Sequence, residues 1–256
     1  GKVLPPKPRA VVKAGMARTF QNIRLFGNMT ALENVMVGRY CRTSAGAITS
    51  ILHGPKFRRE EAESRARAQE LLDFVGLGKS SELLARNMPY GDQRRLEIAR
   101  ALATDPKLIL LDEPTSALDM SVQAQIVELL RDLQKRRRLA YMFISHDLGV
   151  VRHISDRVAI MYLGKIVEIS TTAEIFARAN HPYTQALIAE VPNLERRKRV
   201  FVPIQGEIPS PLKPPSGCTF HPRCPHAMPR CREEAPTLQA IAPGHWSACH
   251  LNQSAS

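Results

Sequence analysis

The sequence lacks the long hydrophobic runs, leader segment and internal repeats that define several common classes of protein. Its longest run of Leu, Ile and Val is four residues, at 108–111, whereas a membrane-spanning helix needs about 20 apolar residues. The first fifteen residues are basic and proline-rich, without an initiator Met or the apolar core of a secretory signal. No motif recurs at a period of about 20–50 residues, which argues against a solenoid. We therefore expect a globular chain that does not cross a bilayer unaided and that starts internally.

The composition bounds the size and charge of that globular chain. A chain of 256 residues with 44% hydrophobic residues can bury one large core, or one core plus a small appendage. Lys and Arg number 36 against 24 Asp and Glu, which gives a net charge of +12. Basic blocks stand at 58–59, 135–138 and 196–199. They are typical of solvated helix faces and a linker, with contact to nucleic acid or anionic lipid as the alternative.

The pattern of apolar residues predicts helices first and an α/β arrangement afterwards. Helical spacing covers 29–40, 58–79 with Gly76 as its stop, and 92–103 with Arg94, Arg95 and Arg100 toward solvent. Next comes a buried parallel strand at 107–111, since four consecutive aliphatics leave neither face for water. The segments that follow are a helix at 121–134, a strand at 140–145, a helix at 148–154, a hairpin of 157–162 with 166–169, and helices at 172–179 and 182–190. Ten of the 19 prolines lie between 203 and 243, which predicts an irregular appendage.

Two carboxylates follow the buried strand, at Asp112 and Glu113. A parallel strand delivers such residues to the carboxyl edge of its sheet, where α/β proteins bind ligands. One acid can hold Mg²⁺, and the next can orient and polarise an attacking water for phosphoryl transfer. The alternative is that both acids are simply solvated at the end of a strand. The residues around them are needed to distinguish a phosphoryl-transfer site from this alternative.

Residues 108–119, LILLDEPTSALD, resemble the Walker B motif and D-loop of the ATP-binding-cassette (ABC) transporter ATPases. The resemblance implies that Asp112 binds Mg²⁺, that Glu113 is the catalytic glutamate and that Asp119 is the D-loop residue. It also implies an α/β fold of the P-loop NTPase type, with ATP and Mg²⁺ as cofactors.

Three further segments resemble motifs of the same family, in the same order. Gln21 resembles the Q-loop glutamine, which senses the γ-phosphate and Mg²⁺ and contacts the membrane subunit, and His146 resembles the switch histidine. The segment around Gly91 resembles the signature motif, whose helix start grips the ATP of the other subunit, since helix N-termini suit phosphates. Its residues here are Tyr90, Gly91, Asp92 and Gln93, after a proline in place of the usual serine. Asp92 and that proline both weaken the expected grip on ATP.

A P-loop is missing from this pattern. The motif G-x-x-x-x-G-K-[ST] cradles phosphates with glycine amides and a lysine, and the sequence contains no such string. Gly78-Lys79-Ser80 is a near match, but Asp73 stands at the first glycine position, and we interpret the segment as a helix C-cap and loop. We expect that the first strands and Walker A are absent from this chain, so that it shows little or no ATPase activity alone.

The two halves resemble different importers. Residues 15–115 are similar to the ATPases of branched-chain amino-acid importers, and residues 116–252 are similar to those of oligopeptide and dipeptide importers, with their Cys-rich C-terminal extension. We expect a chimeric, recombined or misassembled chain, or an unusual natural hybrid.

Four of the five cysteines lie in the last 39 residues. Four thiolates suit an iron–sulfur cluster or tetrahedral zinc, and the resemblance favours [4Fe–4S] with zinc as the alternative. Free thiols and disulfides stay open, and nearby histidines are alternative ligands. The proposed ligands are Cys218, Cys224, Cys231 and Cys249.

These observations predict an ABC ATPase domain lacking Walker A at 1–202, with a helical subdomain at about 22–103, and an extension at 203–256. The resemblance implies the ATP-hydrolysing subunit of a bacterial importer for peptides or amino acids, peripheral on the cytoplasmic face of the inner membrane. Its implied partners are a second ATPase subunit, membrane permease subunits and, indirectly, a periplasmic substrate-binding protein, with no nucleic acid. The rivals are a non-hydrolysing regulatory or metal-cluster-binding module and a chain that does not fold.

Overall fold

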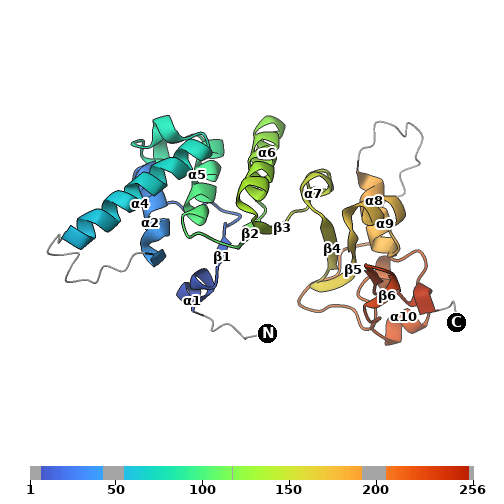
Figure 1. The fold of residues 1–256 in the computed structure, drawn as a ribbon. Coiled ribbons are helices and arrows are strands. Elements are labelled where there is room, and N and C mark those ends of the chain that lie inside the picture. The colour runs from blue at the N-terminus through green and yellow to red at the C-terminus, as the bar shows by residue number, and fades with distance from the viewer. Residues whose placement is uncertain (1–6, 43–54, 117, 192–205, 254–256) are drawn as a thin grey trace. The chain divides into compact units, whose positions relative to one another are not determined.

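The computed structural model describes residues 7–42, 55–116, 118–191 and 206–253. The chain divides into two compact units, residues 1–146 and residues 147–256. In Figure 1 the first unit runs from blue to green and the second from yellow to red. Each unit has its own sheet, so each is described by itself.

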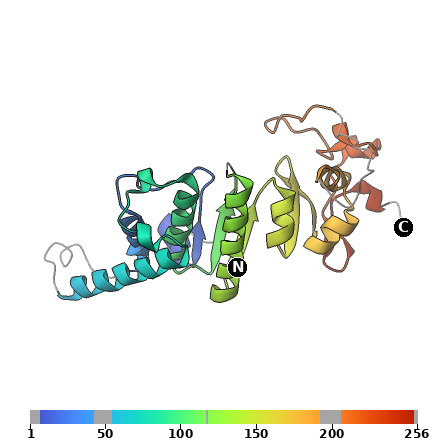
Figure 2. The ribbon, with the colours of Figure 1, turned by 90° about the horizontal axis from the view of Figure 1, so that it is seen from above.

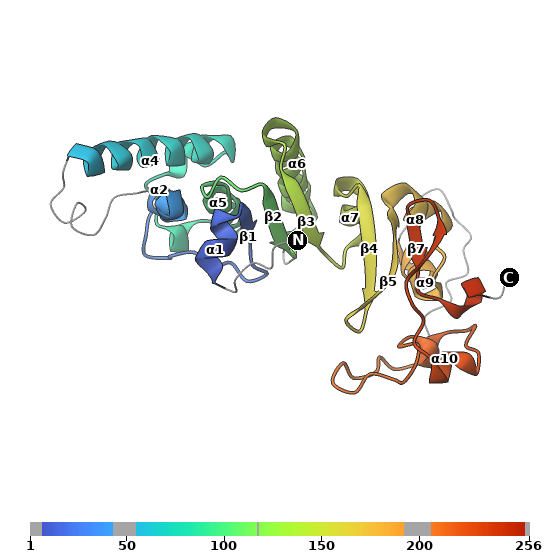
Figure 3. The ribbon, with the colours of Figure 1, turned by 60° about the horizontal axis from the view of Figure 1, so that its bottom comes forward.

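The sheet of the first unit consists of three parallel strands in the order β1-β2-β3 (Figure 3). They span Met16–Arg18, Leu108–Asp112 and Ala140–Ile144. Ile109 and Leu111 of β2 are fully buried, whereas Leu108 and Leu110 are only half-buried. The prediction that neither face of this strand meets water was therefore wrong, although the strand itself is confirmed.

Helix α6, Met120–Arg137, follows β2 as predicted from its apolar spacing. The carboxylate of Asp119 accepts the N–H of Val122 at 2.9 Å and caps the helix, because the first amides of a helix lack internal partners. Ile126, Leu130 and Leu133 form its buried stripe. Tyr141 of β3 donates its hydroxyl to the Leu130 carbonyl at 3.0 Å, which ties this helix to the sheet.

Among the described residues, the other α-helices of the first unit are α1 (Pro8–Lys13), α2 (Ala31–Arg39), α4 (Pro55–Phe74) and α5 (Tyr90–Leu102). Short 3₁₀ helices cover Tyr40–Arg42, Gly78–Ser80 and Ala85–Asn87. Helix α2 packs against both α4 and α5 (Figure 2). Helix α4 ends before Gly76, whose φ of +80° is a left-handed conformation that glycine adopts without strain, so the predicted stop is confirmed.

The second unit begins with α7, Leu148–Ile154, and a hairpin of β4 (Arg157–Tyr162) and β5 (Lys165–Thr171), followed by α8 (Thr172–Arg178) and α9 (Pro182–Glu190). After the proline-rich segment come α10 (Arg230–Glu233), β6 (Gln239–Ala242) and β7 (His245–Ser247), with 3₁₀ helices at His221–Arg223 and His250–Gln253. The strands form one antiparallel sheet in the order β4-β5-β7-β6.

The C-terminal strands thus extend the sheet that the hairpin begins. Trp246 of β7 lies opposite Ile169 of β5. The buried ring of Phe220 packs on Tyr162 and Tyr183, with ring centroids 5.3 Å apart in each pair. The prediction of an irregular appendage therefore needs correction for residues 239–247, which pair as strands. The predicted domain boundary at 202/203 stays a prediction.

Candidate functional site

Glu113 stands directly after β2, in a backbone conformation that few non-glycine residues adopt. Its φ is +44°, and its N–H donates to the Ile144 carbonyl at the end of β3, at 3.0 Å. A non-glycine residue in this left-handed conformation destabilises the fold by about 1 kcal/mol. Strained backbone conformations of this kind are most frequent at functional sites. The neighbouring strand therefore holds the glutamate at the carboxyl edge of the sheet.

Two other predicted site residues converge on that carboxylate. The side-chain amide of Gln21 donates to Oε2 of Glu113 at 3.4 Å, and Nδ1 of His146 lies 3.2 Å from Oε1. The Glu113 side chain is 24% exposed and the His146 side chain is 76% exposed, so solvent reaches the site. Three segments that are far apart in the sequence thus meet around one carboxylate.

Asp112 has a partner that the sequence did not predict. Its Oδ2 lies 2.7 Å from Nη2 of Arg18, at the end of the neighbouring strand β1. The guanidinium of Arg18 also stacks on the Phe20 ring at 5.0 Å, as does that of Arg24 at 4.9 Å. A cation of the protein therefore already faces the carboxylate that was predicted to hold Mg²⁺.

The backbone before the glutamine is held by a buried ion pair on α5. Arg94 and Glu97 are both buried, and Nη1 of Arg94 lies 2.6 Å from Oε2 of Glu97. Arg94 also donates to the carbonyls of Phe20 at 2.7 Å and Gln21 at 2.8 Å, while Glu97 accepts the Phe20 N–H at 3.2 Å. The expectation that Arg94 faces solvent was therefore wrong. Opposite charges three residues apart on a helix face rich in aliphatics were the signal that could have revealed it.

The predicted signature residues lie in the first turn of α5. Tyr90 is 42% exposed, and the Gln93 amide donates to the Met88 carbonyl at 2.8 Å. Gly91 lies so close to Val122 of α6 that an added Cβ would stand 2.9 Å from its Cγ1. Asp92 lies 4.0 Å from the Arg95 guanidinium. In the described part of the chain, no hydrogen bond or ion pair joins these residues to Glu113 or His146.

The four clustered cysteines are all free thiols. Over the described ranges, the structure contains no group of three or more His, Cys, Asp and Glu side chains placed to hold a metal ion. Burial is the main cause of a raised pKa for Cys218 and Cys224, and it raises the pKa of Cys249 to about 11, with smaller contributions from the other thiols. The predicted metal site is therefore not confirmed.

Within the described segments, no helix is both long enough and apolar enough to span a membrane. This finding matches the short hydrophobic runs of the sequence.

Comparisons with known proteins show which proteins this chain resembles. The family model described as "ABC transporter" matches residues 1–116, and "Oligopeptide/dipeptide transporter, C-terminal region" matches residues 167–231. The oligopeptide transport ATP-binding protein AppF of Bacillus subtilis is 49% identical over 196 residues, which cover 74% of this chain and 59% of AppF. This chain is similar to ABC transporter ATP-binding proteins with an oligopeptide/dipeptide transporter C-terminal region. A Sinorhizobium fredii relative named for peptide ABC transport, y4tS, is 52% identical over 202 residues, 77% of this chain and 57% of the relative.

The solved structures agree with this ABC assignment. An ATP-binding cassette in its ADP conformation, MJ1267, superposes with a TM-score of 0.57 at 24% identity, over 72% of each chain. A nucleotide-free cassette gives a TM-score of 0.58 at 25% identity, over 71% of each chain. The predicted ABC ATPase fold and the resemblance to that family are confirmed. The chain spans less than three fifths of the length of the two curated relatives just described. The likeness of residues 15–115 to branched-chain amino-acid importers stays a prediction.

Proposed function

We propose that this chain carries the water-activating half of an ATP site in the ATP-binding subunit of a peptide importer. The observation that carries the proposal is the meeting of Gln21, Glu113 and His146 at 3.4 Å and 3.2 Å. A carboxylate with an amide donor and an imidazole beside it can orient a water for attack on a phosphorus atom. Glu113 would accept the hydrogen bond from that water, and His146 and Gln21 would position the terminal phosphate.

The residues at the sheet edge also suit the cofactors that this family implies. Mg²⁺ prefers oxygen ligands, and Asp112 would supply one of them. When bound with ATP, the ion neutralises charge on the phosphates. The guanidinium of Arg18 would have to leave the Asp112 carboxylate for this to happen. Arg18 therefore competes with the cation for one carboxylate.

The signature residues would serve a partner's nucleotide. Tyr90–Gln93 open helix α5, and no hydrogen bond or ion pair in the described ranges joins them to Glu113. A helix start with free amides suits phosphate. Because the sequence holds no G-x-x-x-x-G-K-[ST] string, we propose that this chain needs an intact second ATPase subunit, and that the 256-residue chain hydrolyses little ATP alone.

The peptide assignment rests on the C-terminal half. The match at 167–231 is to the C-terminal region of oligopeptide and dipeptide transporters, and the relatives described above are named for oligopeptide or peptide transport. We propose permease subunits as the membrane partners, attachment to the cytoplasmic membrane face, and indirect cooperation with a substrate-binding protein.

The test is peptide uptake by membrane vesicles that contain this chain, its permease and an intact second ATPase subunit. Glu113→Gln should abolish ATP-driven uptake, whereas Glu128→Gln, an exposed position on α6, should leave it unchanged. Equal uptake by both variants would contradict the role of Glu113. Robust ATP turnover by the chain alone, lost in Glu113→Gln, would overturn the need for a partner.

A separate proposal concerns the four thiols, which we propose as ligands of an iron–sulfur cluster. Support comes from the hydrogen bond between Cys218 N–H and the Cys231 carbonyl at 2.8 Å, which holds two of the four cysteines side by side. Metals bind thiolates, so a bound cation would oppose the raised thiol pKa values, and the side chains would have to converge. Anaerobic purification with iron and sulfide analysis tests this, with absorbance near 400 nm expected. Stoichiometric zinc without iron would show that the thiols bind zinc and not an iron–sulfur cluster. The absence of both metals from the purified protein would refute both alternatives.

A further inference from the structure

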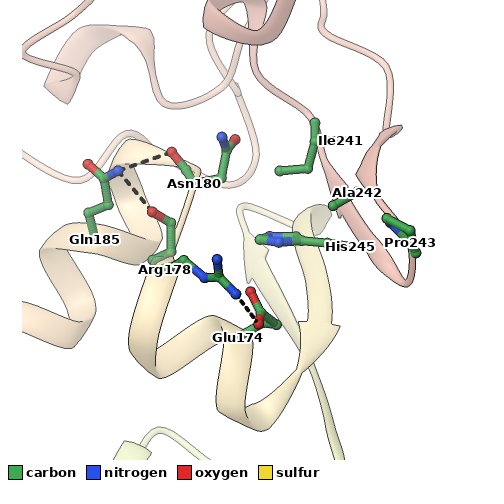
Figure 4. A pocket seen from close by; sticks show the side chains of 9 residues that line it. Glu174, Arg178, Asn180, Gln185, Ile241, Ala242, Pro243 and His245 are labelled. Atoms are coloured by element: carbon green, nitrogen blue, oxygen red, sulfur yellow. Dashed lines mark hydrogen bonds and ion pairs between the residues drawn. The ribbon is translucent and has the colours of Figure 1, made fainter.

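A cavity of about 520 Å³ opens in the second unit and is lined by residues of α8, α9 and the β6–β7 hairpin. It lies outside the unit that contains Glu113, and nothing in the nucleotide chemistry uses it. Figure 4 shows the hairpin residues Ile241, Ala242 and Pro243 along one side, with Glu174 and Arg178 of α8 facing them and His245 between. Ligand sites in proteins commonly occupy about 300–1,000 Å³. The cavity is therefore large enough for a small molecule.

His245 is the most deeply anchored group of the lining. Its side chain is 6% exposed, and Nε2 lies 2.7 Å from Oε1 of Glu168, whose side chain is fully buried. Glu168 also accepts the N–H groups of Asn180 at 2.8 Å and His181 at 2.9 Å. Within the described residues, Nδ1 of His245 makes no hydrogen bond. A buried imidazole with one nitrogen fixed and the other unused is available for a ligand.

The other polar groups of the lining are also held in place. The Gln185 amide donates to the carbonyls of Ala179 at 3.0 Å and Asn180 at 3.2 Å, which leaves its Oε1 as an acceptor. The side chain of Asn180 exchanges two hydrogen bonds of 3.0 Å with Asn252. Groups fixed before binding lose little conformational entropy when a ligand arrives. The lining is therefore preorganised by bonds to the rest of the unit.

The charges of the lining decide the class of ligand. Arg178 and Glu174 form one ion pair, with Nη2 and Oε1 2.8 Å apart, and their side chains are 77% and 37% exposed. This pair uses only one of the five N–H groups of the guanidinium and one oxygen of the carboxylate. A polyphosphate would meet a single guanidinium already balanced by a carboxylate. A ligand with one carboxylate and one ammonium would instead match both members of the pair.

We propose that this cavity binds a small zwitterion with the two charged termini of a short peptide. Its carboxylate would accept the free N–H groups of Arg178, since guanidinium and carboxylate pair well through parallel hydrogen bonds. Its ammonium would donate to the second oxygen of Glu174, to Oε1 of Gln185 and to Nδ1 of His245, which accepts because Nε2 donates to Glu168. Its apolar side chain would pack on the wall formed by 241–243. The proposal does not rest on the ATPase role of the first unit.

The test is calorimetric titration of the full chain with the dipeptide Ala-Leu. Arg178→Gln keeps the length of the side chain and removes its charge, and it should weaken binding at least tenfold. Arg230→Gln is the matched control, because Arg230 pairs with Glu234 at 2.7 Å with the same helical spacing, outside the cavity. The dipeptide acetylated and amidated at its ends should not bind. Circular dichroism of both variants shows that they remain folded.

Three results would overturn the proposal. They are no binding of Ala-Leu to the unaltered chain, equal binding to Arg178→Gln and Arg230→Gln, and undiminished binding of the blocked dipeptide. A variant with less risk of unfolding than any change at His245 adds an independent measurement. Ala242→Phe, at an exposed position of the β6–β7 hairpin, should fill the cavity and abolish binding of Ala-Leu. If this variant binds Ala-Leu as tightly as the unaltered chain, the dipeptide binds outside the cavity.

Discussion

The buried ion pair of Arg94 and Glu97 ties helix α5 to the backbone beside Gln21. The two side chains meet at 2.6 Å, and between them they satisfy the carbonyl and the N–H of Phe20 and the carbonyl of Gln21. Because Tyr90–Gln93 form the first turn of the same helix, helix α5 carries both the signature turn and the ion pair that holds the backbone of Gln21.

Arg94→Met should lower the free energy of unfolding of the first unit by about 3–5 kcal/mol, because it leaves the Glu97 charge buried without a partner. Far-UV circular dichroism in urea measures this change. The control is Arg95→Met, whose side chain is 24% exposed in a 4.0 Å pair and should cost less than about 1 kcal/mol. Similar losses for the two variants would show that the buried pair is not the source of the stability.

The competition at Asp112 gives a second prediction. Arg18→Gln should make the chain bind Mn²⁺, used as a probe for Mg²⁺, several-fold more tightly, because the guanidinium at 2.7 Å no longer neutralises the carboxylate. Arg24→Gln is the matched control, since Arg24 stacks on the same Phe20 ring but does not pair with Asp112. Electron paramagnetic resonance measures free Mn²⁺. Unchanged affinity in Arg18→Gln would mean that Asp112 is not the cation ligand.

Local sequence patterns predicted the helices and strands well, but they did not predict contacts between residues that are far apart in the sequence. Helix α7 has the predicted bounds of 148–154, and the order of β2, α6 and β3 was predicted because aliphatic runs and apolar stripes are read from adjacent residues. The pairing of β5 with β7, with Ile169 opposite Trp246, joins residues 77 positions apart, and no short window contains it. The extension therefore looked irregular in the sequence.

In the candidate site, too, some residues were predicted from the sequence and others were not. Gln21, Glu113 and His146 were predicted from the resemblance, and their side chains do meet. Arg18 was missed because its partner is set by the register of a neighbouring strand, with Arg18 opposite Leu110. Arg94 was missed because its burial depends on distant backbone carbonyls, and helical periodicity places a charged residue in water by default.

The β4–β5 turn carries a residue in a conformation that does not suit it. Leu163 and Gly164 have φ values of +46° and +77°, which is the type I′ pattern that favours Asn-Gly. Leu163→Asn should raise the free energy of unfolding of the second unit by about 1 kcal/mol. Trp246, the single tryptophan and part of β7, reports this unit by its fluorescence. Leu163→Val should have the opposite effect, and a loss of stability in Leu163→Asn would refute the turn argument.

The pH dependence of the second unit follows from His181. Burial lowers the pKa of His181 to about 4 against an opposing effect of the Glu168 carboxylate, while the unfolded chain keeps a value near 6.5. Between these two values the unfolded state binds more protons, so stability is full above about pH 6.5 and falls as the pH drops toward 4, by about 3 kcal/mol in total. His181→Asn keeps an acceptor for the Tyr183 N–H and should flatten this fall in urea titrations followed by Trp246 fluorescence. The control His153→Asn, at an exposed position on α7, should show the same fall in stability as the unaltered chain. If the unaltered chain and both variants have the same pH profile, His181 is not the cause of the fall.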